Sequence, residues 1–169
     1  MKVTALCPGS FDPITTGHVR LIERAASVFD EVVVCVAEND VKVYTFSAGE
    51  REILCRKALA FLRNVRVVRW DGMTADAVDA FGASVIVKGI RNETDFAYET
   101  EMARYNVARN PRAETLFLPA EPCWEHVSST ELKRQLRGNP PDVSLIPEAI
   151  REEVVRKISW IESKEKENE

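Results

Sequence analysis

Hydrophobic residues gather into five short runs, separated by stretches with a helical period. The runs lie at residues 3–7, 31–37, 65–70, 84–88 and 115–118. Three of them are nearly continuous in valine and isoleucine, which is typical of strands that are covered on both faces. The pattern therefore predicts a parallel sheet that lies between two layers of helices.

Segments with the apolar spacing of amphipathic helices fill the gaps between these runs. They lie at roughly 17–29, 48–63, 74–82 and 94–109. Alternating strands and helices are the signature of an α/β fold. We predict a Rossmann-like, doubly wound five-stranded parallel sheet with helices on both faces.

Two further helices are predicted after the fifth run, as a C-terminal helical extension. Ser128 and Glu131 have the spacing of a capping box, which predicts a helix start, and Gly138 predicts its end. The second helix begins near Pro147. Its apolar residues share one face: Ile150, Val154, Ile158 and Ile161.

The chain shows no internal repeat and no linker that would divide it. We therefore expect residues 1–169 to form a single domain. The charged end, residues 164–169, has nothing to bury and is expected to fray into solvent.

Composition narrows the class of protein. Hydrophobic residues make up 45% and charged residues 30%, as in ordinary globular domains. A net charge of −4 argues against nucleic acid or an anionic membrane as a partner. No run approaches the roughly 20 apolar residues that span a bilayer, and no signal-peptide pattern is present, so we expect a cytoplasmic protein.

The four cysteines, Cys7, Cys35, Cys55 and Cys123, are scattered without the spacing of a zinc site. Cys7 and Cys35 stand inside apolar runs. We expect these two to be buried, reduced thiols.

The segment PGSFDPITTGH, residues 8–18, follows the first run and leads into the first predicted helix. A turn at the carboxyl end of a parallel strand presents backbone N–H groups to a phosphate. His18 would lie in the first helical turn, where it can stabilise a phosphate in the transition state, although an isolated histidine is more often a surface or capping residue. The Ser10 hydroxyl would point toward the same phosphate, or Ser10 would serve simply as a turn residue.

Two more phosphate-compatible segments follow the fourth and fifth runs. Lys88 and Arg91 flank Gly89, where they can clamp a phosphate or merely extend into solvent. Residues 127–130 place hydroxyls at a helix N-terminus, where they cap the helix and can also bind a phosphate. Since the carboxyl ends of parallel strands share one edge of a sheet, the three segments together indicate nucleotide phosphate chemistry.

Other candidate residues carry weaker signals. Asp95 and Glu99 are one helical turn apart, a spacing that usually marks a solvated face. Trp124 can stack on a base, but packing is the more common role. Lys42 alone indicates no function, and His126 has the setting of a structural or peripheral residue.

These segments resemble a known family. Residues 15–18, TTGH, are similar to the T/H-x-G-H motif of the nucleotidyltransferase superfamily, and residues 128–130, SST, are similar to its hydroxyl-rich signature. Together with KGIR, DFAYE and VSST, the segment PGSFDPITTGH resembles the bacterial phosphopantetheine adenylyltransferases. The likeness extends from about residue 3 to residue 160.

The resemblance implies an enzyme that transfers AMP from ATP to 4′-phosphopantetheine, in the penultimate step of coenzyme A biosynthesis. The products are dephospho-coenzyme A and pyrophosphate, and the attack is direct and in line. It also implies Mg²⁺ on the ATP phosphates with no metal ligand from protein side chains, a homohexamer, and coenzyme A as a candidate feedback ligand. The alternatives are an enzyme that acts on nicotinamide mononucleotide or on a phosphoalcohol, and a nucleotide-sensing module without catalysis.

The resemblance also implies site residues. His18 would stabilise the transition state, and Lys42 and Arg91 would be the other catalytic residues. The residues expected to bind phosphopantetheine are Ser10, Lys42, Thr74 and Lys88. The residues expected to bind ATP are Ser10, Phe11, His18, Gly89, Ile90, Arg91, Glu99, Trp124, Glu125, His126, Val127, Ser128, Ser129 and Thr130.

A few positions depart from the family pattern. Lys88 keeps the positive charge but lacks the bidentate fork of arginine. The Lys42 loop lacks the proline often present there, and Ala97 replaces a glutamate. Residues 123–126, CWEH, form an unusual version of the loop on the adenine side.

Overall fold

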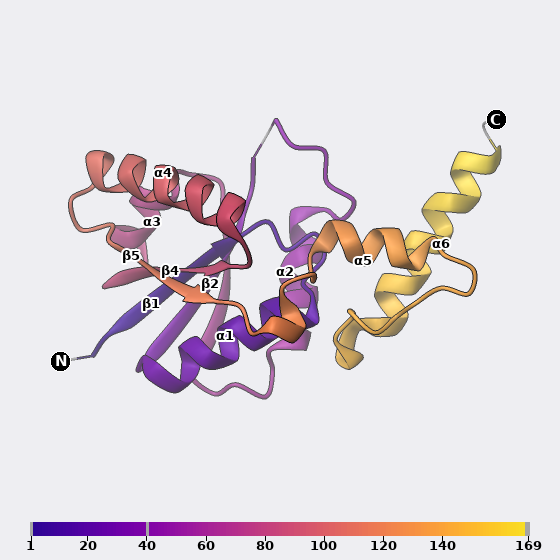
Figure 1. Cartoon of the computed structure of the whole chain (residues 1–169), viewed down its shortest axis with the longest axis horizontal. Helices are drawn as coiled ribbons and strands as arrows, with labels where there is room; N and C mark the ends of the chain where they lie inside the picture. Colours follow the sequence, from indigo (N-terminus) through magenta and orange to yellow (C-terminus); the bar gives the residue numbers. More distant parts are fainter. Residues whose placement is uncertain (1, 40, 168–169) are drawn as a thin grey trace.

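The computed structural model describes residues 2–39 and 41–167. Its strands are β1 (Thr4–Gly9), β2 (Glu31–Ala37), β3 (Val65–Trp70), β4 (Val85–Ile90) and β5 (Thr115–Pro119). They form one sheet in the order β3-β2-β1-β4-β5, and every neighbouring pair is parallel (Figure 1). The predicted five-stranded parallel sheet is confirmed.

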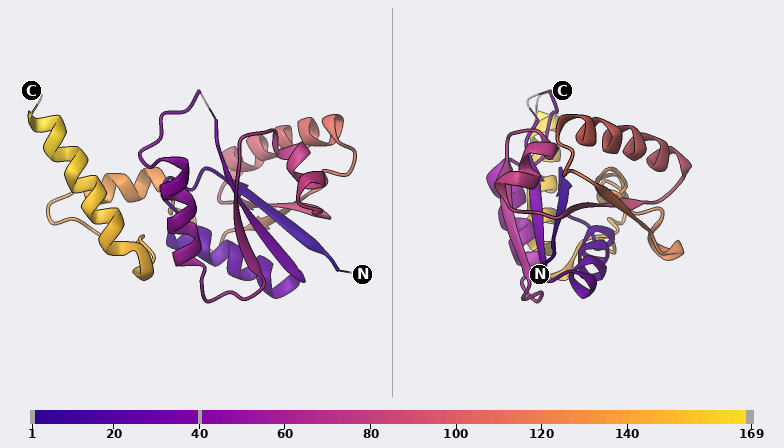
Figure 2. Two further views of the ribbon diagram at one scale, coloured as in Figure 1. Left: turned by 180° about the vertical axis from the view of Figure 1, so that it is seen from behind. Right: turned by 90° about the vertical axis from the view of Figure 1, so that its left-hand side faces the viewer.

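The helices are α1 (Thr16–Val28), α2 (Ala48–Ala58), α3 (Thr74–Ala80), α4 (Glu93–Arg109), α5 (Ser129–Leu136) and α6 (Arg151–Glu167), with short 3₁₀ turns η1 (Pro122–Trp124) and η2 (Glu148–Ile150). Buried residues of α1 and α2 pack on one face of the sheet, and those of α3 pack on the other. Helix α4 contacts α3 and β4 on that second side (Figure 2). The doubly wound arrangement is therefore confirmed.

Strand β2 shows why the apolar runs are continuous. Val34 belongs to the core that includes Ile22 of α1 and Leu54 of α2. Its neighbour Val33 points to the opposite face and belongs to the core that includes Val78 of α3. Because successive side chains alternate between two buried faces, residues 32–37 of the strand are all apolar.

Helices α5 and α6 extend beyond one end of the sheet (Figure 1). Buried Leu132 of α5 and Val154 of α6 join the same core as α1 and α2, so the extension is packed onto the domain. Helix α6 continues to Glu167, into the segment that is expected to fray, and the fraying itself stays a prediction. Lysine and glutamate are good helix formers, and Lys164 pairs with Glu167 one turn away. Residues 168–169 lie outside the described residues.

The end of α2 and the N-terminal cap of α5 differ from the sequence prediction. Helix α2 ends at Ala58 instead of residue 63, because the Leu59 N–H closes the last turn on the carbonyls of Cys55 and Lys57. At α5, Ser128 accepts a hydrogen bond from the Glu131 N–H as predicted. The Glu131 carboxylate accepts from Arg134 and Gln135 instead, so the second half of the expected capping box is not formed.

The cysteines follow the prediction. Cys7 and Cys35 are buried free thiols, as is Cys55, whereas Cys123 is exposed. Burial raises the pKa of Cys7 to about 12 and that of Cys35 to about 12, so both stay protonated. Among the described residues, no helix has both the length and the apolar composition needed to cross a bilayer.

Candidate active site

A cavity of about 480 Å³ opens at the carboxyl ends of β1 and β4. The order of the strands reverses between these two strands, which is where open α/β sheets bind ligands. The cavity is lined by the β1–α1 turn, the start of α4, the start of α5 and part of the loop before α2. The three phosphate-compatible segments therefore meet at one site.

His18 lies in the first turn of α1 and lines the cavity. Its Nδ1 accepts a hydrogen bond from the Thr15 backbone N–H at 3.0 Å, and the Thr15 hydroxyl accepts from the His18 N–H at 3.2 Å. Together these bonds form a capping box in which histidine takes the usual place of glutamate. Because Nδ1 accepts, the ring proton is assigned to Nε2, which can then donate to a ligand oxygen.

The charge state of His18 follows from its surroundings. Burial and then the positive charges of Arg91 and Lys88 lower the pKa of His18 to about 4. The imidazole is therefore neutral at pH 7. A neutral ring fits the role of hydrogen-bond donor, and it does not fit that of a cationic general acid.

Phe11 packs its ring edge-on against His18, with 5.2 Å between the ring centroids. Its φ of 48° is in the left-handed region, which costs backbone energy in a residue other than glycine. A Cβ at Gly9 would meet the Phe11 ring at 3.0 Å, so glycine is needed for this close approach. The turn is thus shaped around the two aromatic rings.

Gly17 brings two of the phosphate-compatible segments together. A Cβ at this position would lie 3.2 Å from the side chain of Val127, in the loop before α5. In the structure it permits the close approach of that loop to α1.

Lys88 and Arg91 are both paired with carboxylates of α4. Lys88 Nζ lies 3.1 Å from Glu99 Oε1, and the Arg91 guanidinium donates two hydrogen bonds to Asp95, at 2.7 and 3.1 Å. The hydrogen bonds from Arg91 lower the pKa of Asp95. Arg91 also donates to the Val127 carbonyl at 3.2 Å.

One interpretation from the sequence is therefore corrected, and one of two open alternatives is excluded. Asp95 and Glu99 line the cavity and hold its cations, so they do not form a solvated face. Likewise, Lys88 and Arg91 do not simply extend into solvent. The spacing of Asp95 and Glu99 does put them on one face of α4, but that face points into the cavity and not into solvent.

The hydroxyls before α5 have mainly structural partners. Ser128 caps the helix, and the Ser129 hydroxyl donates to the Pro13 carbonyl at 2.8 Å. Thr130 is exposed and lines the cavity. The first amides of α5 precede its internal hydrogen bonds, so they are suited to receive an anion.

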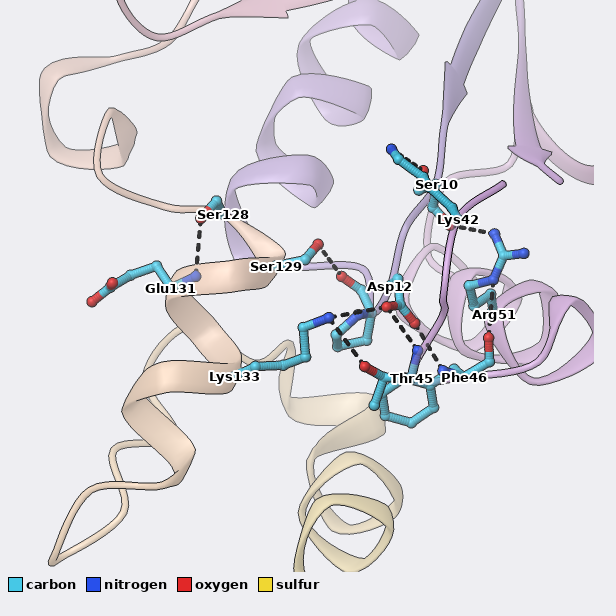
Figure 3. Close-up of polar contacts among 11 residues, drawn as sticks. Ser10, Asp12, Lys42, Thr45, Phe46, Arg51, Ser128, Ser129, Glu131 and Lys133 are labelled. Carbon is cyan, nitrogen blue, oxygen red and sulfur yellow. Dashed lines mark hydrogen bonds and ion pairs between the residues drawn. The ribbon is translucent and has the colours of Figure 1, made fainter. Parts of the chain in front are cut away.

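Lys42 lies beside Ser10. Its Nζ donates to the Ser10 hydroxyl at 3.4 Å, and both residues line the cavity (Figure 3). Phe11, Gly89, Trp124 and Val127 also line it. The local sequence of the Lys42 loop gave no sign of this contact, because it joins segments that are far apart in the chain.

Four expected site residues do not line this cavity: Thr74, Ile90, Glu125 and His126. Thr74 opens α3 after β3, which is the outer strand two places from β1. Glu125 and His126 are exposed. The ligand contacts of these residues stay predictions.

Sequence reasoning missed three charged residues next to the site. Asp12 and Arg51 are 7% and 1% exposed, and Lys133 lines the cavity from α5. Asp12 lies within PGSFDPITTGH, so the motif contained it without suggesting a role. A charged residue inside the otherwise apolar face of α2 was the available signal for Arg51.

The described residues contain no group of three or more His, Cys, Asp or Glu side chains that could hold a metal ion. Each acid that lines the cavity already faces a cationic side chain: Asp12 faces Lys133, Asp95 faces Arg91, Glu99 faces Lys88 and Glu121 faces Arg20.

Comparisons with solved structures support the fold. The chain superposes on a putative nicotinate-nucleotide adenylyltransferase of Vibrio parahaemolyticus with a TM-score of 0.60 at 18% identity, covering 90% of this chain and 97% of that one. It also superposes on a bifunctional NMN adenylyltransferase/ADP ribose pyrophosphatase of Francisella tularensis, with a TM-score of 0.65 at 14% identity. This match covers 88% of this chain and 46% of that one. At these identities the likeness shows the fold alone.

Sequence relatives are more specific. Residues 6–135 match the family model described as cytidylyltransferase-like. The phosphopantetheine adenylyltransferase of Methylococcus capsulatus is 37% identical over 94% of this chain and 98% of its own length. The phosphopantetheine adenylyltransferase of Levilactobacillus brevis is 40% identical over 91% of this chain and 96% of its own length. The chain belongs to the phosphopantetheine adenylyltransferase family, within the cytidylyltransferase-like nucleotidyltransferases.

Proposed function

We propose that this protein transfers the adenylyl group of ATP to 4′-phosphopantetheine, giving dephospho-coenzyme A and pyrophosphate. The observation that carries the proposal is the meeting of His18, the Lys88–Arg91 segment and the Ser10–Lys42 pair in one cavity. Its relatives are phosphopantetheine adenylyltransferases by name. No feature of the cavity favours nicotinamide mononucleotide or a phosphoalcohol.

In the reaction, a phosphate oxygen of phosphopantetheine attacks the α-phosphorus of ATP. A new P–O bond forms, the bond from the α-phosphorus to the bridging oxygen breaks, and pyrophosphate leaves with that electron pair. The attacking oxygen is already anionic, so no general base is needed. Catalysis then depends on positioning and on stabilising charge at the α-phosphate.

His18 would donate from Nε2 to an α-phosphate oxygen. Its other nitrogen is fixed by the Thr15 backbone N–H, so the donor is oriented before the substrate binds. Ser10 and Lys42 would hold the acceptor phosphate from the other side of the turn. The hydrogen-bond donor to the α-phosphate and the residues that hold the acceptor phosphate would then belong to the same wall of the cavity, beside the β1–α1 turn.

Lys88 and Arg91 would contact substrate phosphates from the opposite wall. Their carboxylate partners hold both side chains at the cavity before ligand binding. Less conformational freedom is then lost when a phosphate arrives. The fork of Arg91 suits the phosphates of ATP, and the single charge of Lys88 suits the acceptor phosphate.

Mg²⁺ is expected to enter with ATP as a counter-ion of its phosphates. The lack of a carboxylate cluster among the described residues supports a metal carried by the substrate. Bound there, it would neutralise charge on the departing pyrophosphate.

The experiment is a pyrophosphate-release assay with ATP, Mg²⁺ and 4′-phosphopantetheine, repeated with nicotinamide mononucleotide and with glycerol phosphate. We expect kcat/KM to be greatest for phosphopantetheine and no release without an acceptor. Preferred turnover of either alternative acceptor would refute the proposal. Tight ATP binding without turnover of any acceptor would instead support a nucleotide-sensing module.

The homohexamer implied by the resemblance is also part of this proposal. Helix α4 has no buried residue, and Phe96, Tyr98 and Tyr105 on it are about half exposed, at 52%, 59% and 49%. Burial of these rings against other copies of the chain would remove them from water. Light scattering coupled to size-exclusion chromatography would measure the mass, and a monomer would contradict this part. A cytoplasmic location and feedback by coenzyme A stay expectations.

A further inference from the structure

Asp12 joins the β1–α1 turn to the loop that carries Lys42. Its two carboxylate oxygens accept hydrogen bonds from the backbone N–H groups of Phe46, at 2.8 Å, and Thr45, at 3.0 Å (Figure 3). Burial alone would raise the pKa of Asp12, but these bonds and Lys133 outweigh it, and its pKa is lowered. Asp12 is therefore a buried anion whose oxygens are satisfied by protein groups.

Lys133 adds a third segment to this junction. From α5, its Nζ donates to Asp12 Oδ2 at 3.0 Å and to the Thr45 hydroxyl at 3.1 Å (Figure 3). Its side chain is 27% exposed and that of Asp12 is 9% exposed. One ammonium group thus links α5, the β1–α1 turn and the end of the Lys42 loop (residues 38–39 and 41–46).

Arg51, from α2, also anchors the Lys42 loop. This buried side chain donates to the carbonyls of Ser10 at 2.6 Å, Ala37 at 2.8 Å and Phe46 at 3.2 Å. Its guanidinium also lies 4.0 Å from the ring centroid of Tyr44. The residues on either side of the loop are therefore fixed to the turn that carries Ser10.

Lys42 depends on these anchors for its place in the cavity. It is exposed, and its hydrogen bond to the Ser10 hydroxyl is long, at 3.4 Å. A contact of that length adds little rigidity. The position of Lys42 is therefore set mainly by the residues that fix its loop.

We propose that Lys133, acting through Asp12 and Thr45, is a positioning residue that fixes the Lys42 loop so that Lys42 faces Ser10 across the acceptor site. The kinetic part of this proposal rests on the proposed function. Lys133 also lines the cavity, so the rival role is direct contact with a substrate phosphate. Its bonds to Asp12 and Thr45 favour positioning, because they already direct its ammonium toward the loop.

The first experiment compares Lys133→Met with Arg134→Met. Arg134 is the next residue of α5, with a side chain 71% exposed and paired with Glu131 on the surface, so it is a matched control. We expect Lys133→Met to raise KM for phosphopantetheine about tenfold and to change KM for ATP by less than about twofold. Arg134→Met should alter neither. A rise in KM for ATP instead would overturn the proposal in favour of direct phosphate contact.

A double variant tests whether Lys133 works through Asp12. Asp12→Asn keeps the size of the side chain but removes the charge that faces Lys133. If the two act as one unit, Asp12→Asn/Lys133→Met should be no worse than the more damaged single variant, to within about twofold. Multiplicative effects would show that Lys133 acts independently, which contradicts the proposal.

Hydrogen exchange of the free protein gives a readout that needs no activity. We expect the Thr45 and Phe46 amides to exchange about tenfold faster in Lys133→Met, while amides of β2 are unchanged. Unchanged exchange at Thr45 and Phe46 would overturn the positioning role even if KM rises. If Asp12→Asn does not fold, this measurement on Lys133→Met decides the question. If the wild-type protein does not adenylylate phosphopantetheine, the proposed function fails, while the exchange result still decides whether Lys133 fixes the loop.

Discussion

The two walls of the cavity hold their functional groups by different means. The turn wall, residues 10–18, fixes His18 and Asp12 through hydrogen bonds that involve the backbone. The clamp wall, residues 88–99, holds Lys88 and Arg91 through ion pairs with Glu99 and Asp95. A group tied to the backbone keeps its orientation when a ligand arrives, whereas an ion pair can exchange one partner for another.

The difference suits the chemistry of adenylyl transfer. A fixed donor such as His18 Nε2 can be aimed at charge that develops in the transition state. In the clamp wall each cation is instead paired with a carboxylate, and it becomes available as phosphates compete for it. Substitution of the fixed donor His18 in the turn wall should therefore reduce kcat, and substitutions in the clamp wall should mainly raise KM.

The largest effect is expected for His18→Ala in the turn wall. Loss of one preorganised donor should lower kcat about 100- to 1,000-fold. The dissociation constant for ATP, measured by calorimetry, should change by less than about threefold, because the other ATP contacts are untouched. Near-normal turnover in a folded variant would remove the distinction between the walls.

A smaller effect is expected for Arg91→Ala in the clamp wall. The side chain makes charge-assisted bonds to Asp95 and to the Val127 carbonyl, and its removal should raise KM for ATP about 10- to 100-fold. Arg91→Lys should not restore the wild-type value, because lysine lacks the fork that binds a carboxylate or phosphate bidentately. Full activity of Arg91→Lys in steady-state kinetics would contradict this use of the fork.

A modest effect is expected for Glu99→Gln, which frees Lys88 from its partner. We expect KM for phosphopantetheine to rise about two- to fivefold. We also expect KM to depend more steeply on salt concentration, because Lys88 then carries an unpaired charge. Glu101→Gln on the exposed side of α4 is the matched control. Equal salt dependence of the two variants would show that the pair with Glu99 has no role in the clamp wall.

The smallest effect is expected from pH on His18. Because burial and two cations lower its pKa to about 4, its imidazole NMR signals should not shift between about pH 8 and about pH 5.5. Below the ordinary pKa of 6.5 the unfolded chain takes up the proton first, so this group destabilises the fold as the pH falls toward 4. Loss of the signal in His18→Ala assigns it, and a midpoint near 6.5 would contradict the neutral donor.

Much of the fold could be predicted from the sequence because the signals are local. A strand buried on both faces must be apolar throughout, so β2 and β4 were visible as valine-rich runs. The place of His18 in the first turn of α1 followed from the glycine and the helical period around it. Its capping bond with Thr15 was not anticipated, because glutamate or glutamine usually fills that position.

The partners of charged residues could not be predicted, because they depend on how elements pack. The spacing of Asp95 and Glu99 shows that they share a face of α4, but not that this face looks into the cavity. Aromatic residues usually mark the buried side of a helix, but Phe96 and Tyr98 of α4 are exposed, so they do not indicate which side of α4 faces the protein. Asp12 and Lys133 are likewise 121 residues apart in the chain, and only the fold brings them together.

The central claim is that this cavity adenylylates phosphopantetheine, and a direct competition tests it. One reaction would contain ATP, Mg²⁺ and equal concentrations of 4′-phosphopantetheine, nicotinamide mononucleotide and glycerol phosphate, with products identified by mass spectrometry. The account predicts dephospho-coenzyme A as the dominant adenylylated product, formed about 100-fold or more slowly by His18→Ala. A dominant dinucleotide or adenylylated glycerol phosphate, or formation at the wild-type rate by His18→Ala, would contradict it.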